Sequence, residues 1–145
     1  MFNVNSIKPL YNQKITILNK IKGSDTEDGK DIWVKNVIDS SLWRSISISS
    51  ASGTVVSLGT KHKIYLCDVS KYKPYNEFIS YRGESDYYTI SLNDYIIKGE
   101  VYEDVTSKNI TSILAKHEPN VCKVLNVNFL PDRNLSIVKI VIEGV

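Results

Sequence analysis

Apolar side chains recur at alternate positions through much of the chain, and polar turns separate these short runs. At residues 14–20 the run Lys-Ile-Thr-Ile-Leu-Asn-Lys is rich in β-branched side chains, which favour an extended strand. The same period of two predicts further strands along the chain. We expect strands at residues 14–20, 31–38, 42–48, 61–67, 121–129 and 136–142, with turns at residues 39–41 and 131–134.

The segment Tyr87–Gly99 predicts a hairpin. Apolar and polar side chains alternate before a Leu-Asn-Asp turn at residues 92–94, and an apolar run restarts at Tyr95. We expect the second strand of this hairpin to continue to about Tyr102. Asp94 is accordingly interpreted as a turn residue and not as a catalytic acid.

One helix is predicted at residues 106–117, where apolar side chains recur at three- and four-residue spacing. Thr106 is its expected cap, Ile110, Ile113 and Leu114 form its apolar face, and His117 ends it, where a cation suits the helix dipole. About eight short strands and one helix predict a mainly β fold. We expect an antiparallel β-sandwich or a small barrel with the helix packed on one end.

Length and composition predict a single domain over residues 1–145, with an irregular arm at residues 1–13 and a β-rich core at residues 14–145. An apolar fraction of 42% and a charged fraction of 23% are ordinary for a soluble globular protein. We expect no membrane span and no signal peptide. Cys67 and Cys122 lie in apolar, strand-like runs, so we interpret both as reduced, buried thiols, with a disulfide as the alternative.

Residues for catalysis, cofactor binding or metal binding are not expected. His62 stands between two lysines, which indicates an exposed position at the start of a strand. Two isolated histidines and two distant cysteines do not have zinc-ligand spacing, and the scattered glycines form no phosphate-binding loop. Glu27 with Asp28, and Glu103 with Asp104, are interpreted as solvated loop acids. The sequence therefore predicts a protein that is not an enzyme.

Two segments are candidates for contacts with other proteins. Residues 49–60 are small and uncharged, which predicts a flexible loop tip. Residues 68–86 form a long connection in which tyrosines alternate with lysines, and such loops are usually functional. We predict interface residues in both segments: Ser52, Gly53, Thr54, Val55, Val56, Lys71, Tyr72, Tyr75, Phe78, Tyr81 and Arg82.

A second interpretation of the long connection is a binding site for single-stranded nucleic acid. Aromatic rings can stack on bases while Lys71, Lys73 and Arg82 contact the phosphates. The net charge of +2 is small for such a protein, so a protein interface is the favoured interpretation. Tight packing of this segment on the rest of the domain is the third alternative. Trp33 and Trp43 are expected to pack in the core.

Several segments, taken in order, resemble a family of small bacteriophage virion proteins of uncharacterised-domain type, encoded among head-completion and tail genes. The resemblance runs from about residue 14 to the end of the chain. Its motifs are structural, and the turn Pro-Asp-Arg-Asn at residues 131–134 departs from the family pattern, which has Gly-Ser and a basic residue or histidine there. The matching segments are Ile15–Lys20, Trp33, Trp43, Ile64–Leu66, Tyr72–Phe78, Thr89–Gly99, Ile110–Thr111 and Ile142–Gly144.

The resemblance implies a structural subunit of the virion neck, made in the bacterial host cytoplasm. Such head–tail connector proteins form homo-oligomeric rings around the DNA channel. They bind the portal or adaptor on one side and tail proteins on the other, and the genomic DNA passes through without sequence-specific contacts. The resemblance leaves two alternatives open. The protein could instead be a tail-completion or tail-terminator protein of the same particle, and the particle could be a headless, phage-tail-like one. The family assigns no catalytic residues and no cofactor.

Overall fold

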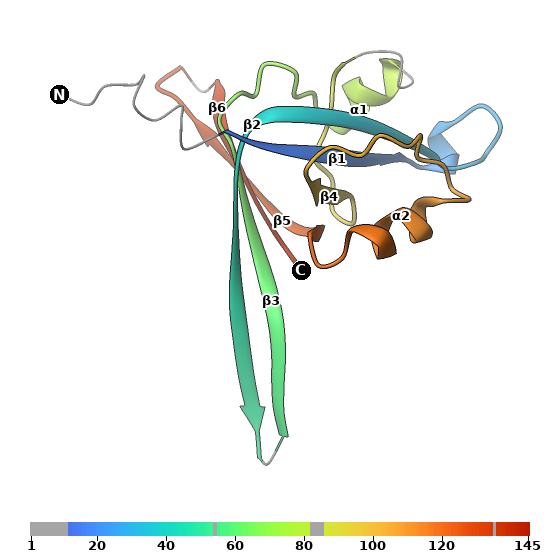
Figure 1. Ribbon diagram of the computed structural model, residues 1–145. Coiled ribbons are helices and arrows are strands. Elements are labelled where there is room, and N and C mark those ends of the chain that lie inside the picture. The colour runs from blue at the N-terminus through green and yellow to red at the C-terminus, as the bar shows by residue number, and fades with distance from the viewer. Residues whose placement is uncertain (1–11, 54, 82–85, 135) are drawn as a thin grey trace.

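A computed structural model describes residues 12–53, 55–81, 86–134 and 136–145, with the side chains of residues 48–52 and 55–58 outside that description. Its strands form a closed antiparallel barrel in the order β1-β2-β3-β6-β5-β4 (Figure 1). This confirms the prediction of a small, mainly β barrel, with six strands where about eight were expected. The strands are β1 (Gln13–Ile21), β2 (Ile32–Ser52), β3 (Val55–Leu66), β4 (Tyr95–Lys98), β5 (Val121–Pro131) and β6 (Ile137–Gly144).

Within the described residues, four short helical segments lie outside the sheet. They are the α-helices α1 (Tyr75–Phe78) and α2 (Ile110–His117) and the 3-10 turns η3 (Gly23–Asp25) and η4 (Ile79–Tyr81). Helix α2 is the predicted helix, and His117 ends it as expected. The predicted cap was wrong: Asn109 precedes the first helical residue, and its Oδ1 accepts a hydrogen bond from Thr106 N at 2.7 Å.

The turn predicted at residues 39–41 does not exist, because β2 continues through it. Ser41 pairs with Gln13 of β1 and also with Leu66 of β3, so β2 changes partner at this residue. The Ser41 hydroxyl donates to Gln13 O, and Gln13 Oε1 accepts a hydrogen bond from Trp43 N at 2.6 Å. Serine favours a turn in isolation. Here the Ser41 side chain instead bonds a backbone carbonyl at the residue where β2 changes its pairing partner.

The hairpin predicted at Tyr87–Gly99 was also wrong, since only its second strand forms. Tyr88 instead makes an isolated parallel bridge with Tyr72, and β4 lies between β1 and β5. The turn before β4 does form, with Asn93 at a φ of 71°. Strand β4 ends at Lys98, short of the expected end, because Gly99 turns the chain at a φ of 93°.

The main core fills the barrel, and a second cluster lies between the barrel wall and α2. Alternation along β1 divides its side chains between them: Ile15 and Ile17 point into the barrel, and Leu18 packs toward α2. Both tryptophans pack as predicted, Trp43 in the barrel core and Trp33 half-buried beside the second cluster. Complete burial of one isoleucine contributes about 2 kcal/mol, so these clusters supply much of the stability.

Candidate functional site

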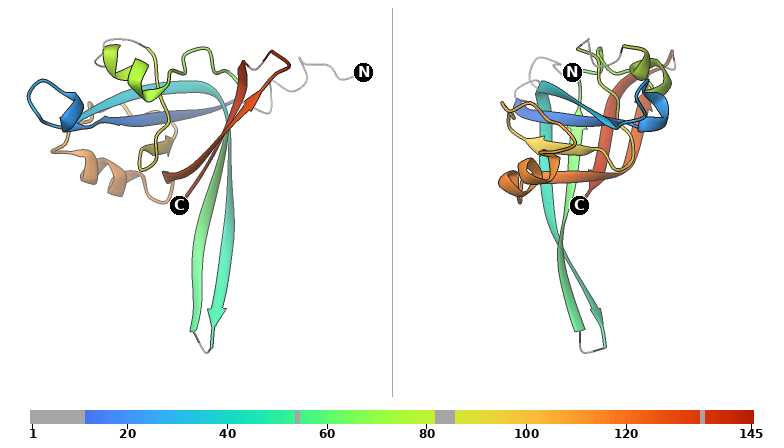
Figure 2. Two further views of the ribbon diagram at one scale, coloured as in Figure 1. Left: turned by 180° about the vertical axis from the view of Figure 1, so that it is seen from behind. Right: turned by 90° about the vertical axis from the view of Figure 1, so that its right-hand side faces the viewer.

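A two-stranded ribbon extends from the barrel and dominates its outline (Figures 1 and 2). Strand β2 pairs with β1 only as far as Ser41, and β3 pairs with β6 only from His62 onward. Between these limits the two strands pair only with each other. We call this ribbon, residues Ile46–Ser52 and Val55–Lys61, the projecting hairpin.

The projecting hairpin replaces the flexible loop expected at residues 49–60. Its strands continue to Ser52 and resume at Val55, so the predicted loop was wrong over nearly its whole length. Gly53 has a φ of 63°, a left-handed conformation that glycine adopts without strain and that tight hairpin turns require. The ribbon carries no charged side chain from residue 47 to residue 60. Both of its long edges lack a neighbouring strand among the described residues.

A polar and aromatic cluster fixes the root of the projecting hairpin to the barrel. Trp43 Nε1 donates to Ser45 Oγ at 3.0 Å, and Ser45 Oγ lies 2.8 Å from His62 Nδ1. The Trp43 and His62 rings are 5.1 Å apart. On the neighbouring strand, Glu143 pairs with Lys61 Nζ at 3.2 Å. These contacts join β2, β3 and β6 where the ribbon leaves the barrel.

The expectation that His62 is exposed was wrong, since only 5% of the residue is accessible. Burial lowers the pKa of His62 below its ordinary value, with a smaller opposing influence from Glu118. The imidazole is therefore neutral at pH 7 and serves as a hydrogen-bonding partner. The flanking lysines indicated a surface position, but in a strand their side chains point to the opposite face from His62.

The long connection after β3 packs as a cap on one end of the barrel. Tyr72 is half-buried, with its ring 6.1 Å from Tyr88 and 5.2 Å from Phe129. Lys73 Nζ pairs with Glu77 at 3.6 Å and lies 4.9 Å from the centre of the Tyr87 ring. Tyr72 and Lys73 therefore have intramolecular partners.

Three further predicted interface residues lie in or next to α1. Tyr75 donates its hydroxyl hydrogen to Asp25 Oδ2 at 2.6 Å, and Phe78 is 1% exposed in a cluster with Ile21 and Val34. The Tyr81 ring lies 4.7 Å from that of Tyr87. The structure thus places Phe78 in the core and leaves the outer surface of α1 polar.

The two predicted interface segments do not meet in one site. Ser52, Gly53, Val55 and Val56 lie in the projecting hairpin, whereas Lys71 lies on the capping segment and pairs with Asp86 at 3.7 Å. Thr54 and Arg82 lie outside the described residues. Sequence reasoning missed a group of exposed apolar side chains on β5 and β6. These are Leu125, Phe129, Leu130 and Val138, 38–51% accessible.

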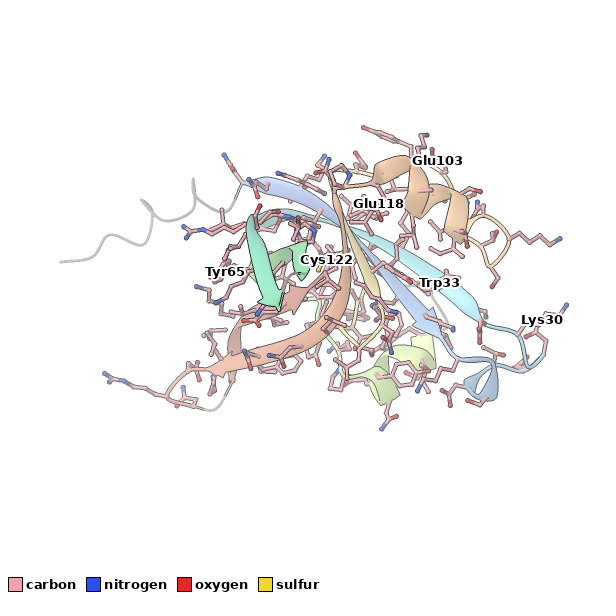
Figure 3. All side chains as sticks on the ribbon, turned by 90° about the horizontal axis from the view of Figure 1, so that it is seen from below. Lys30, Trp33, Tyr65, Glu103, Glu118 and Cys122 are labelled. Carbon is pink, nitrogen blue, oxygen red and sulfur yellow. The ribbon has the colours of Figure 1, made fainter. Side chains whose placement is uncertain are left out.

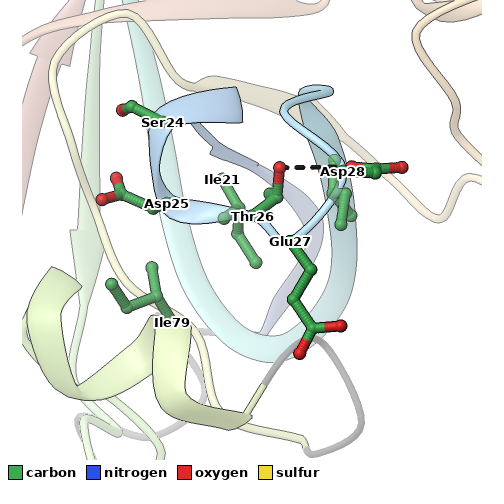
Figure 4. A pocket seen from close by; sticks show the side chains of 8 residues that line it. Ile21, Ser24, Asp25, Thr26, Glu27, Asp28 and Ile79 are labelled. Atoms are coloured by element: carbon green, nitrogen blue, oxygen red, sulfur yellow. Dashed lines mark hydrogen bonds between the residues drawn. The ribbon is translucent and has the colours of Figure 1, made fainter.

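A pocket of about 530 Å³ opens beside the loop between β1 and β2 (Figure 4). Its lining combines the apolar side chains of Ile21, Ile32 and Ile79 with acids of the loop. Two of those acids have hydrogen-bond partners within the protein: Asp28 Oδ1 accepts from Thr26 Oγ1 at 3.3 Å and from the Lys30 amide at 3.1 Å, and Asp25 accepts from Tyr75. The hydrogen bond from the Lys30 amide lowers the pKa of Asp28, which is an exposed side chain.

A second pocket, of about 600 Å³, lies where the turn before β4 meets β1. Lys20, Lys22 and Lys123 line it together with the tilted ring pair Trp33 and Tyr95, whose centres are 6.0 Å apart. The buried Asp94 carboxyl forms part of the same wall. The lining therefore carries both signs of charge and does not define one class of ligand.

The remaining candidates for chemistry lie apart from one another. Figure 3 labels Cys122 among the barrel strands and Glu103 beside α2. Cys122 is fully buried, but Cys67 is exposed, which corrects the prediction for that thiol. Glu103 accepts a hydrogen bond from Lys116. No group of His, Cys, Asp or Glu side chains within the described part of the chain could hold a metal ion.

Comparison with known proteins identifies a family without assigning an activity. No helix among the described residues has the length and apolar character needed to cross a membrane. No curated protein and no solved structure matches the chain. A sequence profile does match residues 10–141 of the 145, and the chain therefore belongs to a family of unknown function, DUF6751.

Proposed function

We propose that this protein is a structural subunit of a ring at the head–tail junction of a bacteriophage or a phage-tail-like particle. The ring surrounds the DNA channel and joins the portal or adaptor to the tail. Two lines support the proposal: the resemblance of the sequence to small virion proteins, and the projecting hairpin. The hairpin is the observation on which the proposal chiefly rests.

An isolated two-stranded ribbon is marginally stable in water, because it has few side chains to bury and both edges are open. The projecting hairpin is in that situation along Ile46–Ser52 and Val55–Lys61. Natural proteins usually protect open edges with charges, prolines or bulges. Residues 47–60, which include the tip of the hairpin, contain neither a charged residue nor a proline. A ribbon of this kind is suited to be covered by a partner.

Ring assembly needs two different patches on each subunit, so that every copy donates one and accepts the other. The projecting hairpin supplies one patch, whose tip lies well away from the barrel (Figure 2). A head-to-tail contact of this kind closes into a ring when the rotation between neighbours divides a full turn. The proposed subunit acts by holding its neighbours, not by chemistry on a substrate.

Single-stranded nucleic-acid binding is the weaker candidate. The lysines predicted to contact phosphates already pair with acids: Lys71 with Asp86 at 3.7 Å, and Lys73 with Glu77 at 3.6 Å. Tyr72, which was expected to stack on bases, packs against Tyr88 and Phe129. These contacts favour a structural role for the capping segment. A tail-completion position within the same particle is compatible with the same hairpin argument.

A shortened hairpin tests the proposal. Residues 48–59 are replaced by Asn-Gly, which closes a tight turn between Ser47 and Thr60, a directly paired position. The barrel should still fold, with cooperative urea unfolding, because none of its core residues is removed. We expect the full chain to form a ring-sized oligomer by light scattering, and the shortened chain to remain monomeric.

Electron microscopy of purified particles, with the chain labelled, tests its location. The label should lie between head and tail, or at the head-proximal end of a headless tail. A label elsewhere on the particle, or particles without the chain, would overturn the neck assignment. Equal oligomerisation of the full and shortened chains would overturn the role of the hairpin.

A further inference from the structure

Strand β5 is paired along most of one edge and open along most of the other. It pairs with β6 along Val124–Pro131, but its pairing with β4 covers only Val121–Lys123. The turn before β4 extends that contact by one residue, through Asn93 N to Val124 O at 2.9 Å. Beyond this point, Leu125–Leu130 makes no backbone hydrogen bond on that edge to any other described residue.

Apolar side chains accompany the open edge. Leu125 is 51% accessible and Leu130 is 43% accessible, while Val138 on the adjoining β6 is 46% accessible. Residues 124–131 contain no charged side chain. An open, uncharged and partly apolar edge is the kind of surface to which another strand adds.

The projecting hairpin cannot cover this edge within one molecule. Figure 1 shows the ribbon extending downward from the barrel, whereas the turn joining β5 and β6 lies at the opposite, upper end. The reverse view in Figure 2 shows the same divergence. Pairing between the two therefore requires a second copy of the chain.

We propose that the projecting hairpin of one copy adds as a strand to the β5 edge, Leu125–Leu130, of the next copy. This inference rests on the proposed ring function and identifies the partner surface within it. The donor strand Ile46–Ser52 and the acceptor edge are each about 20 Å long at 3.3 Å per residue. Since neither residues 47–60 nor residues 124–131 carry a charge, pairing buries backbone groups in mutual hydrogen bonds and desolvates no ion.

The contact is head to tail, because the donor ribbon and the acceptor edge are different surfaces. Each copy keeps one free donor and one free acceptor until the ring closes. The pairing covers the open edge of β5 and one of the two open edges of the hairpin, and it gives the hairpin the third strand that an isolated ribbon lacks.

Thiol cross-linking tests which surfaces meet. In a Cys67→Ser background, one chain carries Ser47→Cys on the exposed hairpin and another carries Asn128→Cys on the exposed β5 edge. Mixed and treated with a short bismaleimide, they should give a covalent dimer that neither forms alone. The matched control replaces Asn128→Cys with Ser112→Cys on the exposed face of α2, and should give no dimer.

A single chain with both Ser47→Cys and Asn128→Cys should give a ladder of multimers. Dimers of Ser47→Cys chains alone would mean that hairpins pair with each other, which overturns the β5 acceptor and leaves the ring proposal standing. An oligomer in light scattering that gives no cross-links between residues 47 and 128 would also overturn the β5 acceptor and leave the ring proposal standing. A monomer at every concentration would overturn the β5 acceptor and the ring proposal together.

A charge at the acceptor edge provides an independent measurement. Asn128→Lys places a charge on the exposed face of β5 beside its open edge, where lysines on edge strands oppose strand addition, and should weaken self-association about tenfold or more. Thr111→Lys, which adds the same charge on the exposed surface of α2, should leave association unchanged. Equal association of the two variants would overturn the proposal, provided that both melt at the temperature of the parent.

Discussion

Asn19 Nδ2 donates a hydrogen bond to Asp94 Oδ2 across 2.8 Å, which joins β1 to the turn before β4. The carboxylate also accepts hydrogen bonds from Ser91 N at 3.1 Å and from Lys20 N at 3.2 Å. Asn19 in turn bonds both backbone groups of Thr89, with its Nδ2 2.6 Å from Thr89 O. Both side chains are almost completely buried. One amide and one carboxyl thus hold a connecting segment against the barrel wall.

The Asp94 carboxyl should titrate well above an ordinary aspartate. Burial raises its pKa to about 6, although hydrogen bonds from Asn19, Lys20 and Ser91 act in the opposite direction. The folded chain therefore keeps this proton at pH values where the unfolded chain has released it. The stabilisation from the protonated group is complete below about pH 4 and is lost as the pH rises through about 6, by about 3 kcal/mol.

Carbon-13 NMR of the aspartate carboxyls measures this directly. We expect the Asp94 signal to titrate with a midpoint near 6. Asp28 provides the comparison, because the backbone amide of Lys30 lowers the pKa of that exposed carboxyl. A midpoint for Asp94 at or below that of Asp28 would contradict the effect of burial.

Removing the Asn19 side chain should destabilise the fold by about 2–4 kcal/mol. Asn19→Ala leaves the N–H and C=O of Thr89 without their partners and takes one donor from Asp94, all in buried positions. Urea unfolding at pH 7 measures the loss. Because a hydrogen bond that favours the ionised form is gone, the pKa of Asp94 should also rise.

The matched control is Asn76→Ala on the exposed surface of α1, which should change stability by less than about 0.5 kcal/mol. Equal stability of the two variants would show that the buried bonds of Asn19 contribute little. An unchanged Asp94 titration in Asn19→Ala would argue against their electrostatic coupling.

Those parts of the fold that bury a regular apolar face could be predicted from the sequence. Alternation at Ile15 and Ile17, and again at Ile140 and Ile142, marks the inward faces of strands that line the barrel. The projecting hairpin lacks that signal, because a ribbon outside the core needs no apolar face. Its serines and glycines resemble those of a loop, and only the structure shows that backbone pairing continues to Ser52.

Closure of the barrel depends on contacts between distant residues, which no local pattern displays. Thr16 Oγ1 donates to Gly99 O at 2.8 Å and accepts from Val101 N at 3.0 Å, which attaches the end of β4 to β1. The segment before β4 likewise bonds to Asn19 instead of folding back on β4. For the same reason, the open edge of β5 could not be predicted before the short length of β4 was known.

The two cysteines should differ sharply in reactivity. Cys67 is exposed, whereas Cys122 is fully buried and burial raises its pKa to about 12. Since the thiolate is the reactive form, a disulfide reagent at pH 8 should label Cys67 rapidly and Cys122 only after unfolding. Mass spectrometry of the labelled protein counts the modified thiols. In Cys67→Ser the native chain should remain unlabelled, and rapid labelling of that variant would contradict the burial of Cys122.

Gly144 should tolerate no side chain, because β5 lies directly against it. A Cβ atom there would lie 2.0 Å from Lys123 O and 2.6 Å from Cys122 Sγ, so the backbone of β5 would have to move. Gly144→Ala should therefore lower the free energy of unfolding by about 2–3 kcal/mol or more, as overpacking of a rigid core does. The neighbouring Val145→Ala, at a residue that is 54% accessible, should stay within about 0.5 kcal/mol of the parent. Urea unfolding measures the free energy of unfolding of both variants. If Gly144→Ala is as stable as the parent, β5 and β6 do not lie as close together at this residue as the structure shows.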